Sequence, residues 1–187
     1  MAVPQRALDS VYGSTPEDWK KHENGGGWVY KTAIVEKSAY LHPTSVVGNS
    51  AKVGDWAKVG DSATVGDWAK VGDWAKVGDS ATVGNWATVG DSATVGDSAT
   101  VGHKTVWATN PPQIQGSRHI ITLCSLTELA IGCHVHDFAY WRKHFRAVAR
   151  AEGYTNEQRD EYVGHCKYPI TVAKKLQSAA KKASKTK

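Results

Sequence analysis

Hydrophobic residues recur every six positions through the middle of the chain. Ten Val-Gly pairs follow one another at this spacing, from Val47-Gly48 to Val101-Gly102, and an alanine stands two residues before nine of these valines. A period of six fits neither an α-helix nor a simple alternating strand. It is typical of an array whose units stack into a solenoid.

Each unit reads Val-Gly-Asp/Asn-Trp/Ser-Ala-Lys/Thr and predicts one short strand and one corner. In an extended stretch such as WAKV at 56–59, side chains alternate, so Ala57 and Val59 share one side and Trp56 and Lys58 the other. We expect the Ala/Val side inside, because it is the uniformly apolar one. The Gly-Asp pair predicts a turn, since glycine accepts a positive φ and Asp or Asn tolerates left-handed geometry.

A longer period of 18 residues is superimposed on the period of six. Residues 53–70 read VGDWAK VGDSAT VGDWAK, and residues 71–88 read VGDWAK VGDSAT VGNWAT. Three hexapeptides therefore form one coil, and residues 18 apart stack at about 4.8 Å. Two faces then carry stacked pairs: Trp56 with Trp74, Lys58 with Lys76, Trp68 with Trp86, and Lys70 with Lys52. The third face carries Ser62, Ser80, Ser98, Thr64, Thr82 and Thr100.

The repeat resembles that of the hexapeptide-repeat proteins. The matching pattern is an aliphatic residue, glycine, two variable positions, a small residue and a variable one, over residues 33–107. The resemblance implies an all-β solenoid, a left-handed parallel β-helix with triangular 18-residue coils. Its left hand comes from the resemblance, since ordinary parallel crossovers are right-handed. Many members are trimers, so a homotrimer is also implied.

The rest of the chain predicts segments of different character. Residues 1–27 form an N-terminal arm or cap, and residues 28–109 form the β-helix with degenerate end coils. Residues 110–168, beyond a pair of prolines, form a small α+β cap unit. Residues 169–187 form a basic, flexible tail.

The cap unit is predicted to contain two strands followed by two helices. The strands lie at 119–125 and 129–133, and the first helix at 137–152. Thr155 and Gln158 form a capping box that opens the second helix. The first helix carries an apolar stripe beside a basic line, namely Phe138, Trp141, Phe145 and Val148 beside Arg142, Arg146 and Arg150.

The net charge of +5 is concentrated at the C-terminal end. Residues 174–187 hold six lysines and no acid, and without them the net charge is −1. Nucleic acid is therefore expected only as a weak partner of this Lys-rich tail. Three cysteines, and a start (MAVPQRALDS) unlike a signal peptide, favour reduced thiols in a cytoplasm. No apolar run reaches membrane-spanning length, so no membrane partner is expected.

The tryptophan and lysine ladders form the first candidate binding site. Its residues are Trp56, Lys58, Trp74, Lys76, Trp68, Trp86 and Lys70. Four exposed tryptophans form a patch that needs an explanation. Trimer contacts would bury them. Alternatively, tryptophan is a platform for a nucleobase whose phosphate a lysine neutralises. The two are compatible, because clefts between subunits often bind ligands, although repeat duplication also accounts for some copies.

A second candidate site, an anion pocket, lies in the cap unit. Its residues are Ser117, Arg118 and His119, with His134, His136 and Arg142. Arginine matches phosphate through its planar fork. The alternative is that these residues form the hydrogen bonds that dock the cap.

Other repeated or clustered polar residues favour structural roles. A zinc site built from Cys133, His134, His136, His165 and Cys166 has no standard spacing. The corner aspartates have the wrong period for calcium-binding solenoids and are expected to be turn residues. The Ser/Thr face resembles an ice-binding surface only loosely and is expected to pack or to face solvent. No metal or cofactor is expected.

The cap unit also resembles uncharacterised phage and prophage hexapeptide-repeat proteins. The matching segments are GSRH at 116–119, IGCHVH at 131–136, Trp141 and GYTNEQRDEY at 153–162. We therefore expect a non-enzymatic phage-type protein in the host cytoplasm. It would sequester a small anionic ligand such as a linear or cyclic nucleotide immune signal, acting as a sponge against anti-phage defence.

Two other functions stay open. Many hexapeptide-repeat proteins are acyltransferases with a histidine base, and the repeat region offers His42 and His103. Its coils, however, have no inserted loop of the kind that builds such sites. Relatives that are carbonic anhydrases use three histidines between subunits, and no such set stands on these coils. A structural phage component is the other alternative, and no catalytic residue is assigned.

Overall fold

The chain divides into two compact units, Met1–Pro111 and Pro112–Lys187, in the computed structural model, which describes residues 2–185. The first unit holds the repeats. The second holds an antiparallel sheet and three helices.

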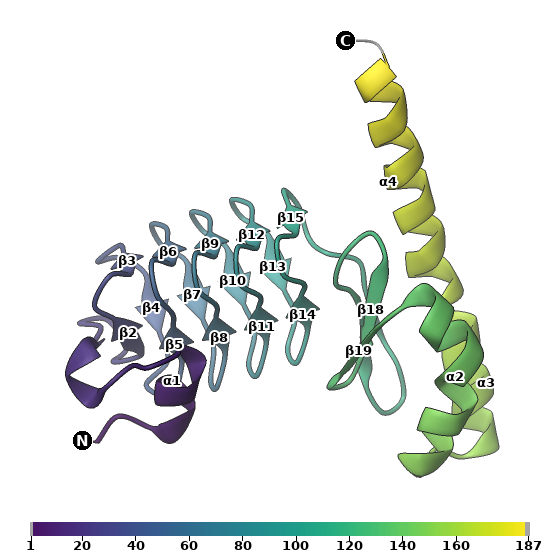
Figure 1. Ribbon diagram of the computed structural model, residues 1–187, viewed down its shortest axis with the longest axis horizontal. Helices are drawn as coiled ribbons and strands as arrows, with labels where there is room; N and C mark the ends of the chain where they lie inside the picture. Colours follow the sequence, from purple (N-terminus) through teal and green to yellow (C-terminus); the bar gives the residue numbers. More distant parts are fainter. Residues whose placement is uncertain (1, 186–187) are drawn as a thin grey trace. The chain divides into compact units, whose positions relative to one another are not determined.

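The repeats of the first unit form a parallel β-solenoid with three sides (Figure 1). Each strand pairs with the strand 18 residues away, as when Lys76 and Val77 align with Lys58 and Val59. The predicted β-helix with 18-residue coils is therefore confirmed. The three rows are β2 (Trp28–Tyr30), β5 (Val46–Val47), β8 (Thr64–Val65), β11 (Thr82–Val83) and β14 (Thr100–Val101); β3 (Ile34–Val35), β6 (Lys52–Val53), β9 (Lys70–Val71), β12 (Thr88–Val89) and β15 (Val106–Trp107); and β4 (Tyr40–Leu41), β7 (Lys58–Val59), β10 (Lys76–Val77) and β13 (Thr94–Val95).

The interior of the solenoid is filled by the alanine and valine of every repeat. Ala57 and Val59 are both 0% exposed, and the equivalent residues of the other repeats are buried in the same way. Small side chains suit this interior, because each coil is only three short strands around and must pack to the density of a protein core. The predicted Ala/Val face is thus confirmed.

The corners correct one prediction. The positive φ falls on the residue after the aspartate, as at Trp56 (57°) and Ser62 (54°), and not on the glycine of the repeat. Trp56 therefore stands in the turn, and the strand begins only at Lys58. Glycine is required for space: a Cβ on Gly54 would lie 2.2 Å from Oδ1 of Asp73 in the next coil.

The aspartates link one coil to the next at each corner. The backbone N–H of Asp55 donates to Oδ1 of Asp73 at 2.9 Å, and the N–H of Trp74 donates to the carbonyl of Asp55 at 2.8 Å. Asn49 and Asn85 keep the acceptor oxygen where they replace aspartate. The aspartates are therefore turn residues, as predicted, and they also satisfy backbone donors that the short strands leave unpaired.

The N-terminal segment covers the first coil. It contains α1 (Gln5–Ser10), the 3₁₀ helix η1 (Pro16–Asp18) and β1 (Trp19–Lys21), which pairs antiparallel with β2. Ala7 and Val11 pack there with Trp19, Trp28 and Val46. The helix α1 was not predicted.

The second unit is a four-stranded antiparallel meander followed by helices. Its strands are β16 (Gln113–Gln115), β17 (Ile120–Leu123), β18 (Glu128–Ile131) and β19 (His134–Asp137). The two predicted strands correspond to β17 and β18, whereas β16 and β19 were not predicted. Trp141 is buried beneath the sheet, and its Nε1 donates to the carbonyl of Leu129 at 2.8 Å.

Three helices complete this unit. They are α2 (Phe138–Ala151), α3 (Asn156–His165) and α4 (Lys167–Lys185). Asp137 caps α2 through the N–H of Tyr140 at 2.6 Å, and the predicted capping box of Thr155 and Gln158 opens α3. Residues 169–185, which we predicted to be a flexible tail, belong to α4. Residues 186–187 of that predicted tail lie outside the described residues.

Candidate functional site

The four corner tryptophans form two stacked pairs. The ring centroids of Trp56 and Trp74 lie 5.5 Å apart with an interplanar angle of 16°, and those of Trp68 and Trp86 lie 4.9 Å apart at 5°. These side chains are between 47% and 61% exposed. The other four of the chain's eight tryptophans are at most 7% exposed. The four corner tryptophans are therefore not part of the core of the single chain.

Lysines stand in register beside each tryptophan pair. Lys58 aligns with Lys76 on one side of the solenoid, and Lys52 aligns with Lys70 on another. All four side chains are exposed, and none has an ion pair within residues 2–185. Like charges directly opposite each other on neighbouring strands are unfavourable. A bound anion would relieve this repulsion.

The outer ring faces of the tryptophan pairs are the accessible ones. Within each pair the rings are in direct contact, so no third ring fits between them. One corner row runs Ser38, Trp56, Trp74, Ser92, and the other runs Ser50, Trp68, Trp86, Lys104. Beyond the pairs, three of the four adjoining corner residues are small serines. A flat ligand can extend a ladder by one rung at these places.

The position next to Trp68 combines an open ring face with two cations. Ser50 occupies the adjoining corner, and Lys52 and Lys70 lie two residues after Ser50 and Trp68 in paired strands. An aromatic base stacked on Trp68 would thus lie beside both ammonium groups. Of the predicted ladder residues, Trp68 and Lys70 meet here, with Lys52 as an additional member, whereas Lys58 and Lys76 lie on another side of the solenoid.

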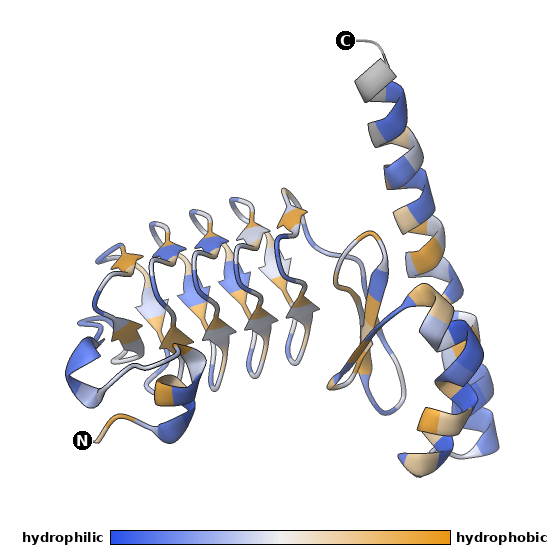
Figure 2. Ribbon diagram, viewed as in Figure 1, coloured by the Kyte–Doolittle hydropathy of each residue, from blue (hydrophilic) through white to orange (hydrophobic). Residues whose placement is uncertain are grey.

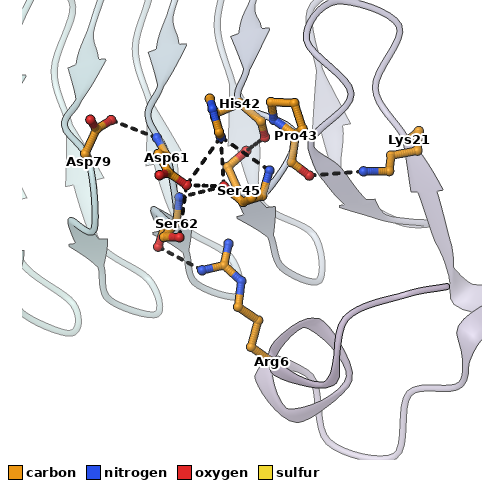
Figure 3. Close-up of polar contacts among 9 residues, drawn as sticks. Arg6, Lys21, His42, Pro43, Ser45, Asp61, Ser62 and Asp79 are labelled. Atoms are coloured by element: carbon orange, nitrogen blue, oxygen red, sulfur yellow. Dashed lines mark hydrogen bonds and ion pairs between the residues drawn. The ribbon is translucent and has the colours of Figure 1, made fainter. Parts of the chain in front are cut away.

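A polar cluster surrounds His42 near the start of the solenoid (Figure 3). Its Nδ1 lies 2.8 Å from Oγ1 of Thr44 and 3.4 Å from Oδ1 of Asp61. Thr44 also donates a short hydrogen bond to Asp61. Hydrogen bonds from Thr44 and from Ser62 hold the pKa of the Asp61 carboxyl below its usual value, so it stays anionic at neutral pH. Sequence reasoning named His42 as a candidate base but did not link it to Thr44 and Asp61, because both follow it in the chain without a recognisable motif.

The other histidine of the repeat region has a structural partner. His103 Nδ1 accepts a hydrogen bond from the N–H of Asn85 at 3.0 Å. His103 therefore replaces the aspartate oxygen in the last coil. This ring nitrogen is already used, and it holds a corner in the way that Asp73 does.

Ser117, Arg118 and His119 bond to neighbouring parts of the second unit. Both the N–H and the hydroxyl of Ser117 donate to the carboxylate of Glu161. Arg118 donates to the carbonyl of Gly153 at 3.2 Å, and its guanidinium lies 5.2 Å from the Tyr154 ring centroid. These contacts all lie within the second unit itself.

Tyr162 is the residue that the sequence did not reveal. Its hydroxyl is buried, donates to the carbonyl of His119 at 2.7 Å and accepts from the N–H groups of Arg118 and His119. It thereby fixes the turn between β16 and β17 to α3. A tyrosine in the GYTNEQRDEY segment gives no signal of this long-range role.

The remaining predicted residues of the anion pocket are spread over the second unit. His134 bonds to Glu152 at 3.1 Å, and His136 stacks on Tyr140 with centroids 3.8 Å apart. Arg142 is exposed on α2 and lines a different cavity from the one that His119 and His134 share. The structure thus does not bring this set into a single pocket. Within residues 2–185, no group of three or more His, Cys, Asp or Glu is arranged to hold a metal.

Comparisons with known proteins add little to this geometry. Comparisons with protein-family models and with curated proteins find no match. A solved structure of the Arabidopsis UDP-N-acetylglucosamine acyltransferase is similar, with 22% identity and a TM-score of 0.30. The similarity covers 46% of this chain and 32% of the acyltransferase chain, so this chain spans about a third of that protein. At this level of likeness, the match says nothing about activity.

The structure also bears on membrane insertion. Among the described residues, no helix is both long and apolar enough to cross a membrane.

Proposed function

We propose that this protein is a non-enzymatic binder that sequesters a small nucleotide on its tryptophan and lysine ladders. The observation that carries the proposal is the pairing of exposed, parallel tryptophans with lysines that have no acidic partner in the described chain. Stacking on an aromatic ring contributes about 1–3 kcal/mol per base and tolerates any base. Lysine supplies the charge for the phosphate.

The base would add one rung to a ladder. On Trp68 it would occupy the space above Ser50, and its phosphate would lie between Lys52 and Lys70. A cyclic dinucleotide has two bases and two phosphates, so it suits a protein with two such ladders or several copies of them. We further propose a homotrimer and a role as a phage-encoded sponge for a nucleotide immune signal, both of which rest on the sequence resemblances.

The repeat supplies matched variants that test the binding site. Serine stands at equivalent corners with the same backbone, at φ of 54° to 59°, so Trp68→Ser with Trp86→Ser should leave the fold intact. Threonine stands at the equivalent strand position elsewhere, so Lys52→Thr with Lys70→Thr is equally conservative. Each double variant is expected to weaken nucleotide binding by about tenfold or more, measured by calorimetry.

The control for these variants is on the third row of corners. Ser80→Ala with Ser98→Ala should change neither affinity nor melting temperature. Unchanged affinity in both ladder variants, with the fold intact, would show that the ladders do not bind the nucleotide. Sedimentation equilibrium of the same samples would report whether the particle has three times the mass of the chain.

A second function, acyl transfer, is favoured by the cluster at His42. A carboxylate near Nδ1 orients an imidazole and leaves Nε2 as a general base. His42, Thr44 and Asp61 have this arrangement. Release of free thiol from an acyl-thioester donor, lost in His42→Gln and in Asp61→Asn, would support this function. If the unmodified protein released no free thiol, the acyl-transfer function would be contradicted.

A further inference from the structure

The helices of the second unit enclose an apolar groove. Its volume is about 660 Å³, within the range of small-molecule sites. Its floor is formed by side chains of α2, α3 and α4, namely Phe138, Trp141, Phe145, Val163 and Ile170. Cys166 also lines the groove, and burial raises the pKa of its thiol to about 11, so it is uncharged at neutral pH. The floor is therefore free of charge.

The rim of the groove is cationic. The charged residues that line it are Arg142, Lys143, Arg146, Lys167 and Lys174, and no lining residue is acidic. In the described part of the chain, only Arg146 of these five has an ion pair, with Asp160 at 3.2 Å. Figure 2 shows that α2 carries both hydrophobic and hydrophilic residues.

The charge of the rim selects among possible occupants. A second copy of the chain that presented the same groove, as in a two-fold dimer, would bring two sets of cations together, which is costly. An occupant with a long apolar body and an acidic end would instead match both floor and rim. The groove is lined over about two and a half turns of α2, from Phe138 to Arg146, which is roughly 12 Å of helix. This length suits a single alkyl chain better than a folded partner, whose interface would be larger.

We propose that this groove binds a single-chain anionic amphiphile, with its alkyl tail on Trp141 and Val163 and its acidic head group at the basic rim. The site is independent of the tryptophan and lysine ladders. It also gives Arg142 a role that differs from the predicted anion pocket. The shared chemistry of possible ligands is an alkyl chain with a phosphate or carboxylate head.

The direct test is calorimetric titration of the full-length protein with monomeric dodecyl phosphate, and with dodecanol as the uncharged comparison. We expect saturable one-to-one binding of dodecyl phosphate and weaker binding of dodecanol. Val163→Trp places a larger side chain on the floor from a position that is 37% exposed, and it should reduce affinity for both probes about tenfold or more. Its melting curve shows whether it folds.

A second variant tests the rim without touching the floor. Lys143→Gln with Lys167→Gln and Lys174→Gln alters exposed positions only, and should reduce affinity for dodecyl phosphate about tenfold while leaving dodecanol unchanged. The matched control is Lys58→Thr with Lys76→Thr on the solenoid, which should leave both affinities unchanged. The double variant Trp68→Ser with Trp86→Ser should also bind dodecyl phosphate normally. The experiment therefore distinguishes a failure of the nucleotide proposal from a failure of the groove proposal.

Vesicles distinguish a free amphiphile from a lipid surface. If the protein adsorbs to phosphatidylglycerol vesicles but does not bind monomeric dodecyl phosphate, and Val163→Trp adsorbs equally well, the attraction is general and the groove proposal is overturned. Equal affinity for dodecyl phosphate and dodecanol would overturn the role of the rim. Weaker binding of monomeric dodecyl phosphate by both variants, with the fold retained, is the result that we expect.

Discussion

The corner residue of each repeat carries a backbone geometry that its side chain does not favour. Trp68, Trp74 and Trp86 have φ of 60° to 63°, in the left-handed region where a bulky residue is uncommon. That region costs roughly 1–2 kcal/mol for a residue with a Cβ. Serine occupies equivalent corners at the same cost with much less exposed apolar surface. Folding of the single chain therefore does not explain the tryptophans, whereas the nucleotide binding that we propose would.

Glycine in the repeat is fixed by the aspartate of the next coil. In Gly54→Ala the new Cβ would lie 2.2 Å from Oδ1 and 2.8 Å from N of Asp73, and the latter is backbone that cannot move alone. We expect a loss of about 1–3 kcal/mol, measured by urea unfolding. Gly164→Ala is the control, since its Cβ meets nothing within 4 Å and helical alanine is favourable. Equal stability of Gly54→Ala and the unmodified protein would refute this account of the corner.

A partly buried carboxylate makes one corner sensitive to pH. Burial raises the pKa of Asp67, although the N–H of Asn49 opposes the shift. A raised folded-state pKa means that the charged form destabilises the fold, and that this penalty develops as pH rises through the ordinary carboxyl range. Asp67→Asn keeps the acceptor oxygen, as Asn85 does one coil further on.

We therefore expect Asp67→Asn to melt at a higher temperature than the unmodified protein at pH 7, with the difference shrinking as pH falls below the ordinary carboxyl pKa. Thermal melts from pH 3 to pH 8 would measure it. A variant that melts lower at pH 7 would contradict the assigned cost of the Asp67 charge.

At the scale of elements, the strands and coils of the repeat could be predicted, whereas the conformation of its corners could not. The valine period and the 18-residue superperiod fixed the coil, because stacking requires equivalent residues to recur. The corner φ was misassigned to glycine, since a sequence shows that glycine is needed but not whether for φ or for space. Residues 169–187 were predicted to be a tail because six lysines and no acid stand at 174–187, yet residues 169–185 belong to α4.

The candidate sites, too, could be predicted from the sequence only in part. The stacked tryptophan and lysine pairs follow directly from the period, so the sequence placed them correctly. The partners of His42 and of His119 come from other coils and helices, as Asp61 and Tyr162 do, and only the fold brings them near. The groove among α2, α3 and α4 likewise depends on an unpredicted helix.

Tyr162 is expected to hold the second unit together at the junction of its sheet and α3. Tyr162→Phe leaves two N–H groups and one carbonyl without the hydroxyl that pairs them. We expect a loss of about 1–3 kcal/mol in the unfolding of this unit, measured by hydrogen exchange of the amides of Arg118 and His119. Tyr168→Phe, at a 62% exposed position, is the control. Unchanged exchange in Tyr162→Phe would refute the role of the hydroxyl.

At the scale of the whole molecule, a uniform core supports a decorated surface. The central coils of the solenoid share an Ala/Val interior and aspartate or asparagine links at their corners, and sheet pairing joins each coil only to its neighbours. The side chains that differ between repeats therefore change the surface with little effect on the fold. Some repeats have tryptophan where others have serine, and some have lysine where others have threonine. These differences place aromatic rings on two of the three corner rows and cations on two of the three sides.

The most direct measurement is to incubate the purified protein with linear and cyclic nucleotides, isolate the bound fraction, release it by heat and identify it by mass spectrometry. We expect an intact nucleotide in a fixed ratio to protein, and its loss in Trp68→Ser with Trp86→Ser. A chemically altered nucleotide would contradict a purely binding role. No retained nucleotide, or equal retention by the folded ladder variant, would contradict the claim that the tryptophan and lysine ladders bind it.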